Sequence, residues 1–402
     1  MRHIKKTKIK NQQPFAKFRR MTTASVLSAL IALGLNACSK KEAPVADQPS
    51  AALAPGNDSS ATKPVAYISS QNGGITVYSL TDFSVIRQIE VGEGARGLGL
   101  SDDGKTLAVA VKETSDIAIV DTATGTVRTR VPVGKNPEFV RVLGDRAFVA
   151  YEPSAKGGPP PKPGTPEFEA MKAKQADQAK KGKDDDEDEP PAQVAIIDLN
   201  KGVKLSEFTA GMETEGIEFN GDGTHVVVTN EADENVSVHN IATGELVKKI
   251  DTQSRGIRPR GIKRAPDGKE FAVTLEYGNK LLILDEQYNI VREADTGDVP
   301  YGVTYNKAGD EILVALSKGE KIQVFDSKTL QLKREYPVGK RCWHFSFTPD
   351  EKNLIVACGR SSEILVLDAK TGEKLKSLPD DKLPWGVVVY PKAKGSLDTP
   401  KS

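Results

Sequence analysis

Seven side chains that could bind or act on a ligand stand at the same point of a motif that recurs along this 402-residue chain. We call them the ring residues: Arg96, Glu138, Glu215, Arg260, Tyr301, Trp343 and Trp385. In repeat order, four charged residues are followed by three aromatic ones. If the fold gathers them at one mouth, that mouth has a polar half and a stacking half, which suits a planar or amphipathic ligand carrying charge.

The charged ring residues allow two interpretations. Glu138 and Glu215, together with Arg96, Arg260 and the nearby His344, are residue types that supply a base, an acid and oxyanion stabilisation in a hydrolase. Alternatively, Arg96 pairs with Glu138 and Arg260 pairs with Glu215 across neighbouring repeats, while the aromatic side chains pack as core. His344 replaces the Gly that follows the ring residue in most repeats, so its position suggests a function.

The sequence gives little support to chemistry that depends on a metal ion or a cofactor. The sequence contains no HExxH, CxxC or CxxCH motif, so catalytic zinc and covalently attached c-type haem find no support. His225 and His239 stand at strand positions and are interpreted as structural. No metal site is predicted, and no cofactor is required by the sequence.

Residues 95–134 show the unit that must position each ring residue. Four short apolar runs, each closed by Asp/Gly or Thr/Gly turn residues, predict a four-stranded antiparallel meander. The third run recurs with a step of about 42 residues, for example from Asp326 to Asp368, and this period is typical of a propeller blade. One such unit cannot bury both of its faces, so the copies must pack on one another.

The two ends of the repeat region complete each other. Residues 65–91 hold three strands of a unit without the first, and Trp385 to Tyr390 forms a first strand with nothing after it. Pairing them leaves no unit unfinished. The sequence therefore predicts an all-β, seven-bladed β-propeller over residues 65–392, with four-stranded antiparallel blades and closure by the C-terminal strand. In such a fold the ring residues face the mouth of the central channel.

Several elements of the second repeat resemble the YVTN family of β-propellers, within the group of cytochrome d1-like and lactonase-like propellers. They are the segments SDDGKTLAVAV, DTATGTV and VPVG. The resemblance covers roughly residues 65–391. Its matching residues are turns and strand interiors, so it implies the fold rather than an activity.

The N-terminus has the order of a bacterial export signal. Residues 1–20 carry eight Lys or Arg, and the short apolar run from Ala24 to Leu35 ends at an Asn-Ala pair before Cys38. This ending resembles the lipobox of bacterial lipoproteins, which implies that residues 1–37 are a signal peptide and that Cys38 is lipidated. Ser39 in place of Asp implies outer-membrane sorting, with the protein on the periplasmic side or exposed at the surface. An ordinary secreted protein with an incidental Cys is the alternative.

Charge excludes one class of partner once the signal peptide is removed. The whole chain has 56 Lys and Arg against 55 Asp and Glu. Eight of the basic residues and none of the acidic ones precede residue 38, so the mature chain carries 48 against 55, a net charge of −7. No nucleic-acid binding is expected, because it requires a basic surface.

Three segments outside the repeat pattern and one pair of cysteines complete the predicted domain organisation. Residues 38–64 read as a flexible tether, residues 153–192 as a disordered charged insert within blade three, and residues 393–402 as a C-terminal tail. The insert joins the second and third strands, so it would emerge at the mouth as a lid or docking arm. Cys342 and Cys358 flank one hairpin and form either a cross-strand disulfide or two free thiols.

Three functional classes remain, and we expect the first. It is a non-enzymatic lipoprotein, anchored to the membrane, whose propeller binds a protein partner or small ligand at the channel mouth. The alternatives are a lactonase-like hydrolase and a redox propeller linked to haem or quinone. Carboxylates near His344 that are free of Arg would favour an enzyme, whereas salt-bridged Glu138 and Glu215 around a flat mouth would favour a scaffold.

Overall fold

The computed structural model describes residues 63–152, 165–166, 169–170, 173 and 190–398. Cys38, the predicted signal peptide and almost all of the predicted tether lie outside these residues, as does most of the insert. Among the described residues, no helix is long and apolar enough to cross a membrane.

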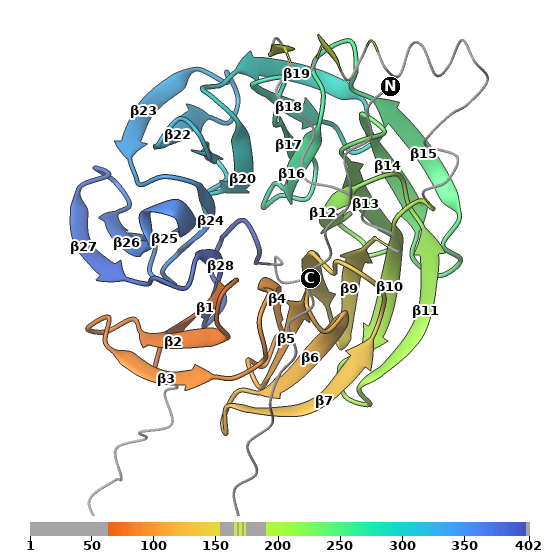
Figure 1. The fold of residues 1–402 in the computed structure, drawn as a ribbon. Helices are drawn as coiled ribbons and strands as arrows, with labels where there is room; N and C mark the ends of the chain where they lie inside the picture. Colours follow the sequence, from red (N-terminus) through yellow and green to blue (C-terminus); the bar gives the residue numbers. More distant parts are fainter. Residues whose placement is uncertain (1–62, 153–164, 167–168, 171–172, 174–189, 399–402) are drawn as a thin grey trace, which may run out of the picture. The chain divides into compact units, whose positions relative to one another are not determined.

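Seven four-stranded antiparallel sheets surround a common centre, and this confirms the predicted propeller (Figure 1). Blade one contains β28 (Pro384–Tyr390), β1 (Val65–Ser70), β2 (Ile75–Ser79) and β3 (Val85–Ile89). Blade two contains β4 (Ala95–Leu100), β5 (Thr106–Val111), β6 (Asp116–Asp121) and β7 (Thr126–Pro132). Blade three contains β8 (Phe139–Leu143), β9 (Arg146–Tyr151), β10 (Gln193–Asp198) and β11 (Val203–Thr209).

The remaining blades follow the same order from the channel outward. Blade four contains β12 (Thr214–Phe219), β13 (His225–Asn230), β14 (Asn235–Asn240) and β15 (Leu246–Asp251). Blade five contains β16 (Pro259–Arg264), β17 (Phe271–Leu275), β18 (Lys280–Leu284) and β19 (Ile290–Asp295). Blade six contains β20 (Pro300–Tyr305), β21 (Glu311–Leu316), β22 (Lys321–Asp326) and β23 (Leu332–Pro337). Blade seven contains β24 (Cys342–Phe347), β25 (Asn353–Cys358), η2 (Gly359–Ser361), β26 (Glu363–Asp368) and β27 (Lys374–Pro379).

Closure of the ring takes place in blade one, as predicted. The last strand, β28, pairs antiparallel with β1, with Val65 opposite Tyr390 and Ile68 opposite Val387. This pairing joins the two ends of the repeat region, so the inner edge of β1 is covered by another strand.

Burial explains the different patterns of the strands. Every residue of β5 is buried, because both faces of this strand pack against neighbouring blades. The outer strand β7 alternates between exposed and partly buried residues, as a half-solvated strand should. Between blades two and three, Ala108 and Ile117 share a core cluster with Val140 and Val149. The core is therefore a series of layers between adjacent blades.

A β-bulge turns the ring residue toward the channel in six blades. In β4, β12, β16, β20, β24 and β28, the register of pairing shifts across the ring residue, which is left out of the ladder. Bulges redirect a side chain and end regular pairing. In blade three, Glu138 directly precedes β8 and its N–H donates to the carbonyl of Ala150 at 3.0 Å.

The Gly after the ring residue allows neighbouring blades to approach. A Cβ built on Gly97 would lie 2.5 Å from the carbonyl oxygen of Glu138, and one on Gly302 would lie 2.5 Å from that of Trp343. Hydroxyl groups strengthen the corresponding contacts between other blades: Thr229 of blade four donates to the Arg260 carbonyl, and Thr274 of blade five donates to the Tyr301 carbonyl. The ring residues are thus held by backbone contacts between blades.

After β28 the chain runs into the centre of the ring (Figure 1). The N–H of Phe347 donates to the carbonyl of Lys394 at 2.8 Å, and the N–H of Ser396 donates to the carbonyl of Phe345 at 2.9 Å. Ser346 and Gly395 form an isolated antiparallel bridge. Residues 393–398 therefore lie along the inner edge of β24, within the central channel.

Candidate functional site

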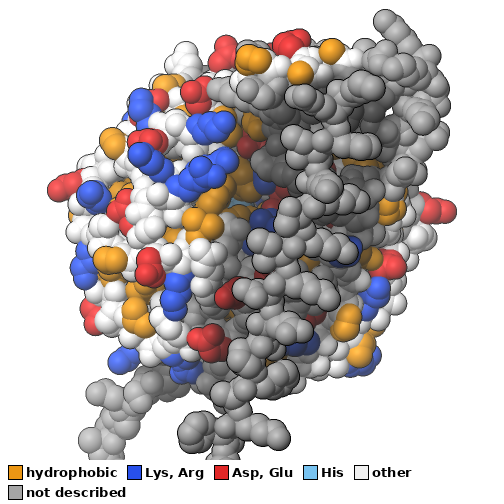
Figure 2. Space-filling model, viewed as in Figure 1, with side chains coloured by type: hydrophobic (Ala, Val, Ile, Leu, Met, Phe, Trp, Pro, Cys, Tyr) orange, Lys and Arg blue, Asp and Glu red, His pale blue; other side chains and the backbone are white. Residues whose placement is uncertain are grey.

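All seven ring residues line one cavity of about 440 Å³ at the channel mouth. Its polar wall carries six Glu and six Arg or Lys side chains, so its formal charge is balanced. Trp343 and Trp385 lie on the opposite, aromatic side, and Tyr301 joins the two halves. The mouth is concave, a shape that small-molecule sites favour. In the uncovered part of the face shown in Figure 2, Lys and Arg side chains lie close to hydrophobic ones near the centre, in the sector of β20 and β22.

The charged ring residues form the ion pairs of the second interpretation. Arg96 contacts Glu138, and Nη2 of Arg260 lies 3.0 Å from Oε1 of Glu215. Burial raises the pKa of Glu215 well above its ordinary value, and the guanidinium of Arg260 opposes that rise. These carboxylates are therefore engaged by arginine.

A second ring of residues, which the sequence analysis missed, surrounds the first. Its members directly follow the second strand of each blade: Gln71, Lys112, Glu152, Glu231, Glu276, Ser317 and Gly359. The first five line the cavity. Their common place after the second apolar run was the signal that could have found them.

Two arginines and two second-ring carboxylates form a buried network in blades four and five. Arg258 contacts Glu231, and its Nε lies 3.3 Å from Oε2 of Glu276. Arg260 contacts Glu231 as well, and its Nη1 lies 3.0 Å from Oε2 of Glu276. Burial raises the pKa of Glu231, whereas for Glu276 the two guanidinium groups outweigh burial and lower the pKa.

Glu152 differs from the other cavity carboxylates. Within the described part of the chain it has no ion pair, and it accepts a hydrogen bond from Nδ2 of Asn136 at 3.1 Å. Burial, followed by the negative charge of Glu138, raises the pKa of Glu152 to about 7. A carboxylate with such a pKa is suited to exchange protons at neutral pH.

Three cations of the cavity wall have no carboxylate partner among the described residues. Lys112 and Arg360 are exposed, and Arg341 is half-buried. Arg341 and Arg360 come from the two ends of the β24–β25 hairpin, where the N–H of Arg360 donates to the carbonyl of Lys340. They leave positive charge available beside Trp343.

His344 packs against two aromatic residues of the cavity. The ring centroid of His344 lies 4.3 Å from that of Trp385 and 5.4 Å from that of Tyr301. His344 is 4% exposed and does not line the cavity itself. Its Nδ1 lies 3.0 Å from Oγ of Ser396, so its hydrogen-bond partner is a hydroxyl rather than a carboxylate. Burial, then the charges of Arg260 and Arg141, hold the pKa of His344 well below its usual value.

The other histidines belong to the sheet of blade four. Nδ1 of His225 lies 3.0 Å from the hydroxyl of Tyr288, and Nε2 of His239 lies 3.0 Å from Oγ of Ser237. Neither lines the cavity. Among the described residues, no group of three or more His, Cys, Asp or Glu could hold a metal ion. Residues 99–106 match the letters of a phosphate-binding loop, but they form the β4–β5 turn and a strand follows where that motif needs a helix.

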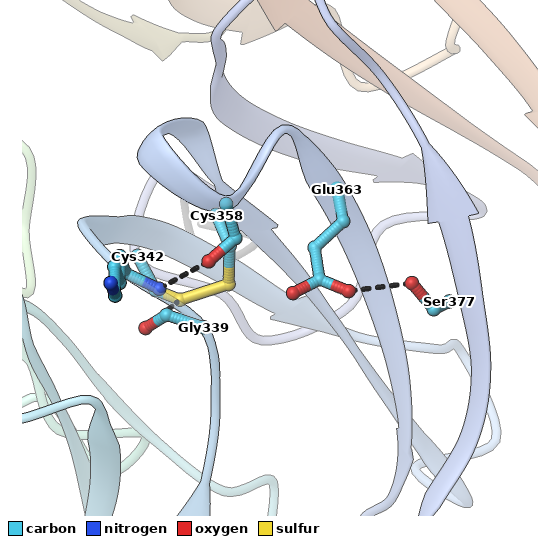
Figure 3. The surroundings of a disulfide bond; sticks show 7 residues. Gly339, Cys342, Cys358, Glu363 and Ser377 are labelled. Atoms are coloured by element: carbon cyan, nitrogen blue, oxygen red, sulfur yellow. Dashed lines mark hydrogen bonds between the residues drawn. A yellow bond between two sulfur atoms is a disulfide. The ribbon is translucent and has the colours of Figure 1, made fainter.

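The structure contains a disulfide between Cys342 and Cys358 (Figure 3). These residues face each other in the β24–β25 ladder. Phe345 pairs with Val356, one residue away from the Ile355 that a regular hairpin would place there, because the bulge at Trp343 shifts the register. The bond therefore joins the strand ends that carry Trp343, Arg341 and Arg360.

Comparisons with known proteins find the fold but no close relative. No protein-family model and no curated protein matches the chain. A candidate 6-phosphogluconolactonase from Bacteroides uniformis is 15% identical with a TM-score of 0.63, covering 82% of this chain and 100% of that one. The periplasmic gluconolactonase of Pseudomonas aeruginosa is 15% identical with a TM-score of 0.63, covering 82% and 99%. Hydrazine synthase from Kuenenia stuttgartiensis is 17% identical with a TM-score of 0.56, covering 74% and 89%. At these identities the likeness shows a β-propeller.

These findings correct the expectation of a non-enzymatic binding protein. Solved structures similar to this chain include proteins named as lactonases, which back the hydrolase alternative instead. The geometry explains why the ring residues alone led to the expectation of a non-enzymatic protein. Glu138 and Glu215 are salt-bridged, as a scaffold requires, but the mouth is a cavity rather than flat. Glu152, its carboxylate without an ion pair in the described part of the chain, belongs to the second ring.

Proposed function

We propose that the protein is a lactonase-like hydrolase that opens a sugar lactone at the channel mouth. The observation that carries this proposal is Glu152, the cavity carboxylate without an Arg partner among the described residues and with a pKa of about 7. It lies in one cavity with buried guanidinium groups and aromatic side chains. The names of structurally similar proteins supply the reaction class.

Each half of the cavity has a part in the proposed reaction. Glu152 removes a proton from water, whose oxygen attacks the lactone carbonyl carbon. Negative charge then develops on the carbonyl oxygen, and Arg96 or Arg260 stabilises it. The ring C–O bond breaks, its oxygen takes up the proton, and the product is a hydroxy acid. Trp343 and Trp385 stack on the apolar face of the sugar ring.

The unpaired cations favour a substrate with an anionic substituent. Arg341 and Arg360 flank the hairpin that carries Trp343, Lys112 lines the same cavity from blade two, and none of the three has a carboxylate partner among the described residues. A phosphate attached to the sugar would find guanidinium donors there. We expect a lower KM for a phosphorylated gluconolactone than for gluconolactone itself, and R360Q should raise the KM of the phosphorylated substrate alone.

The activity is tested by proton release from purified protein supplied with each lactone, after subtraction of spontaneous hydrolysis. E152Q should lower the catalysed rate by at least about 100-fold, which is the usual contribution of a general base. E286Q, which changes an exposed Glu in the β18–β19 turn, should leave it unchanged. Rates equal to the spontaneous rate with both lactones, or full activity in E152Q, would overturn the proposal.

We also propose that the chain belongs to the YVTN propellers and is a periplasm-facing lipoprotein of the outer membrane. The lipobox resemblance at Cys38, the disulfide and the periplasmic location named for the Pseudomonas aeruginosa enzyme support it. The wild-type protein should take up labelled palmitate and sediment with outer membranes. C38S should do neither. Wild-type protein found free of membranes would contradict the lipid anchor.

A further inference from the structure

The C-terminal residues 393–398 occupy the channel below the cavity. A Cβ on Gly302 of blade six would meet the side chain of Ser396, and one on Gly386 of blade one would meet that of Leu397. Together with the backbone bonds to β24, these contacts place one short segment against the inner strands of blades one, six and seven. We call this segment the plug.

Arg141 of blade three binds the plug by hydrogen bonds to its backbone. This arginine of β8 is fully buried, and its Nη1 and Nη2 donate to the carbonyls of Asp398 at 3.0 Å and Ser396 at 3.3 Å. Its Nε donates to the carbonyl of Ile217 in blade four at 2.8 Å. A buried guanidinium needs such acceptors, because an unpaired charge in the interior is costly.

The side chains of the plug are as firmly placed as its backbone. Oδ2 of Asp398 accepts a hydrogen bond from the hydroxyl of Ser346 at 2.8 Å. Leu397 is buried and belongs to the same core cluster as Trp385. The plug therefore has both polar and apolar anchors.

Ser396 connects the plug to the candidate site. Its Oγ accepts the N–H of Phe345 at 3.1 Å and lies 3.0 Å from Nδ1 of His344. The other nitrogen of this imidazole, Nε2, is buried without a partner among the described residues. The ring lies beneath Tyr301 and Trp385, which line the cavity.

We propose that the plug closes the channel below the cavity and that Ser396 is a positioning residue that holds the His344 imidazole beneath Tyr301 and Trp385, which form the floor of the site. Ligand and product then pass only through the mouth. The floor stays dry because the chain's own C-terminal segment, rather than water, fills the channel below it. This inference concerns the architecture of the site and does not depend on lactonase activity.

The groups around His344 define what a test must detect. Arg141 on β8 and Arg260 on β16 bring positive charge, Tyr301 on β20 brings a neutral phenol, and Phe139 and Trp385 bring uncharged rings. Burial, followed by the charges of Arg260 and Arg141, lowers the pKa of this imidazole well below its ordinary value. A negative charge placed at Ser396 would reverse this balance only if Ser396 lies beside the ring.

Tryptophan fluorescence reads this out directly. The chain has two Trp residues, so W343F leaves Trp385 as the single reporter, 4.3 Å from His344. A protonated imidazole quenches a neighbouring indole, so the emission of W343F should stay flat from pH 8.5 to pH 5. Adding S396D should produce a fall on acidification with a midpoint at or above about 6.5, the ordinary pKa of His. Adding S206D, which places the same charge on the exposed outer strand β11, should leave the profile flat, and H344Q should abolish the fall.

Truncation provides the second measurement. In the W343F background, a chain ending at Lys392 lacks the plug, so water reaches the imidazole and a fall should appear in the same pH range. A chain ending at Asp398 should stay flat. The proposal is overturned if S396D gives the same flat profile as S206D. If the chain ending at Lys392 does not fold, S396D alone decides.

Discussion

The guanidinium of Arg260 lies 4.0 Å from the ring centre of Tyr301, and its Nη2 donates to the phenol oxygen at 2.5 Å. This pair joins the charged half of the mouth to its aromatic half. The same guanidinium contacts Glu215, Glu231 and Glu276, so one side chain of β16 is shared by three buried carboxylates. Arg260 is therefore central to both the stability and the electrostatics of the cavity.

R260M should destabilise the protein by about 3–5 kcal/mol, because it leaves the buried Glu215 without its arginine partner. Urea unfolding measures this change. The exposed Arg146 provides the control, and R146M should stay within about 0.5 kcal/mol of the wild type. A loss below about 1 kcal/mol in R260M would show that Arg258 and protonation compensate for the missing charge.

E152Q should stabilise the fold at alkaline pH. The folded state binds the Glu152 proton more tightly than the unfolded chain does, since burial raises the pKa to about 7 from an unfolded value of about 4.3. The carboxylate therefore costs stability progressively as the pH rises from about 4 to about 7, and the full cost remains above that range. Thermal melts should show E152Q above the wild type at pH 8, with the difference vanishing near pH 4. An equal difference at both pH values would contradict the raised pKa.

The position of Trp343 depends on the absence of a side chain at residue 359. A Cβ on Gly359 would overlap the indole ring of Trp343. G359A should therefore displace the indole, shift its fluorescence to the red and raise the KM for lactone. G221A, where the nearest atom would lie at an ordinary 3.5 Å, should change neither property. An unaltered emission spectrum in G359A would contradict the packing described here.

Reduction of the disulfide should loosen the same hairpin. Cys342 and Cys358 are 16 residues apart, and closing a loop of this length is worth about 3 kcal/mol in the chain-entropy account. The double variant C342S/C358S should lose about this much stability and show a raised KM, because Arg341 and Arg360 flank the bond. Alkylation should add mass at these thiols only after reduction. Alkylation of the unfolded protein without reductant would contradict the bond.

The repeat pattern predicted the fold because each blade contains its own local signals. The closing pair of Trp385–Tyr390 with Val65–Ser70 followed from counting strands, and the ring residues followed from their place at the start of each inner strand. Glu152 was missed because it lies between an apolar run and the charged insert, outside the motif that carries the ring residues. The contact between His344 and Ser396 joins residues 52 apart, and the plug has no periodic pattern that could reveal it. Long-range contacts of irregular segments leave no such signal in a single sequence.

The pH dependence of kcat/KM for lactone hydrolysis tests the central claim most directly, because it reports the pKa of the base in the free enzyme. Glu152 must be ionised to act, so log kcat/KM should rise with unit slope below about pH 7 and level off above it. E286Q should reproduce this profile. In E152Q, log kcat/KM should no longer rise between pH 5 and pH 7, and its value at high pH should be lower than in the wild type. A wild-type profile that stays level from pH 5 to pH 8 would contradict the assignment of Glu152 as the base.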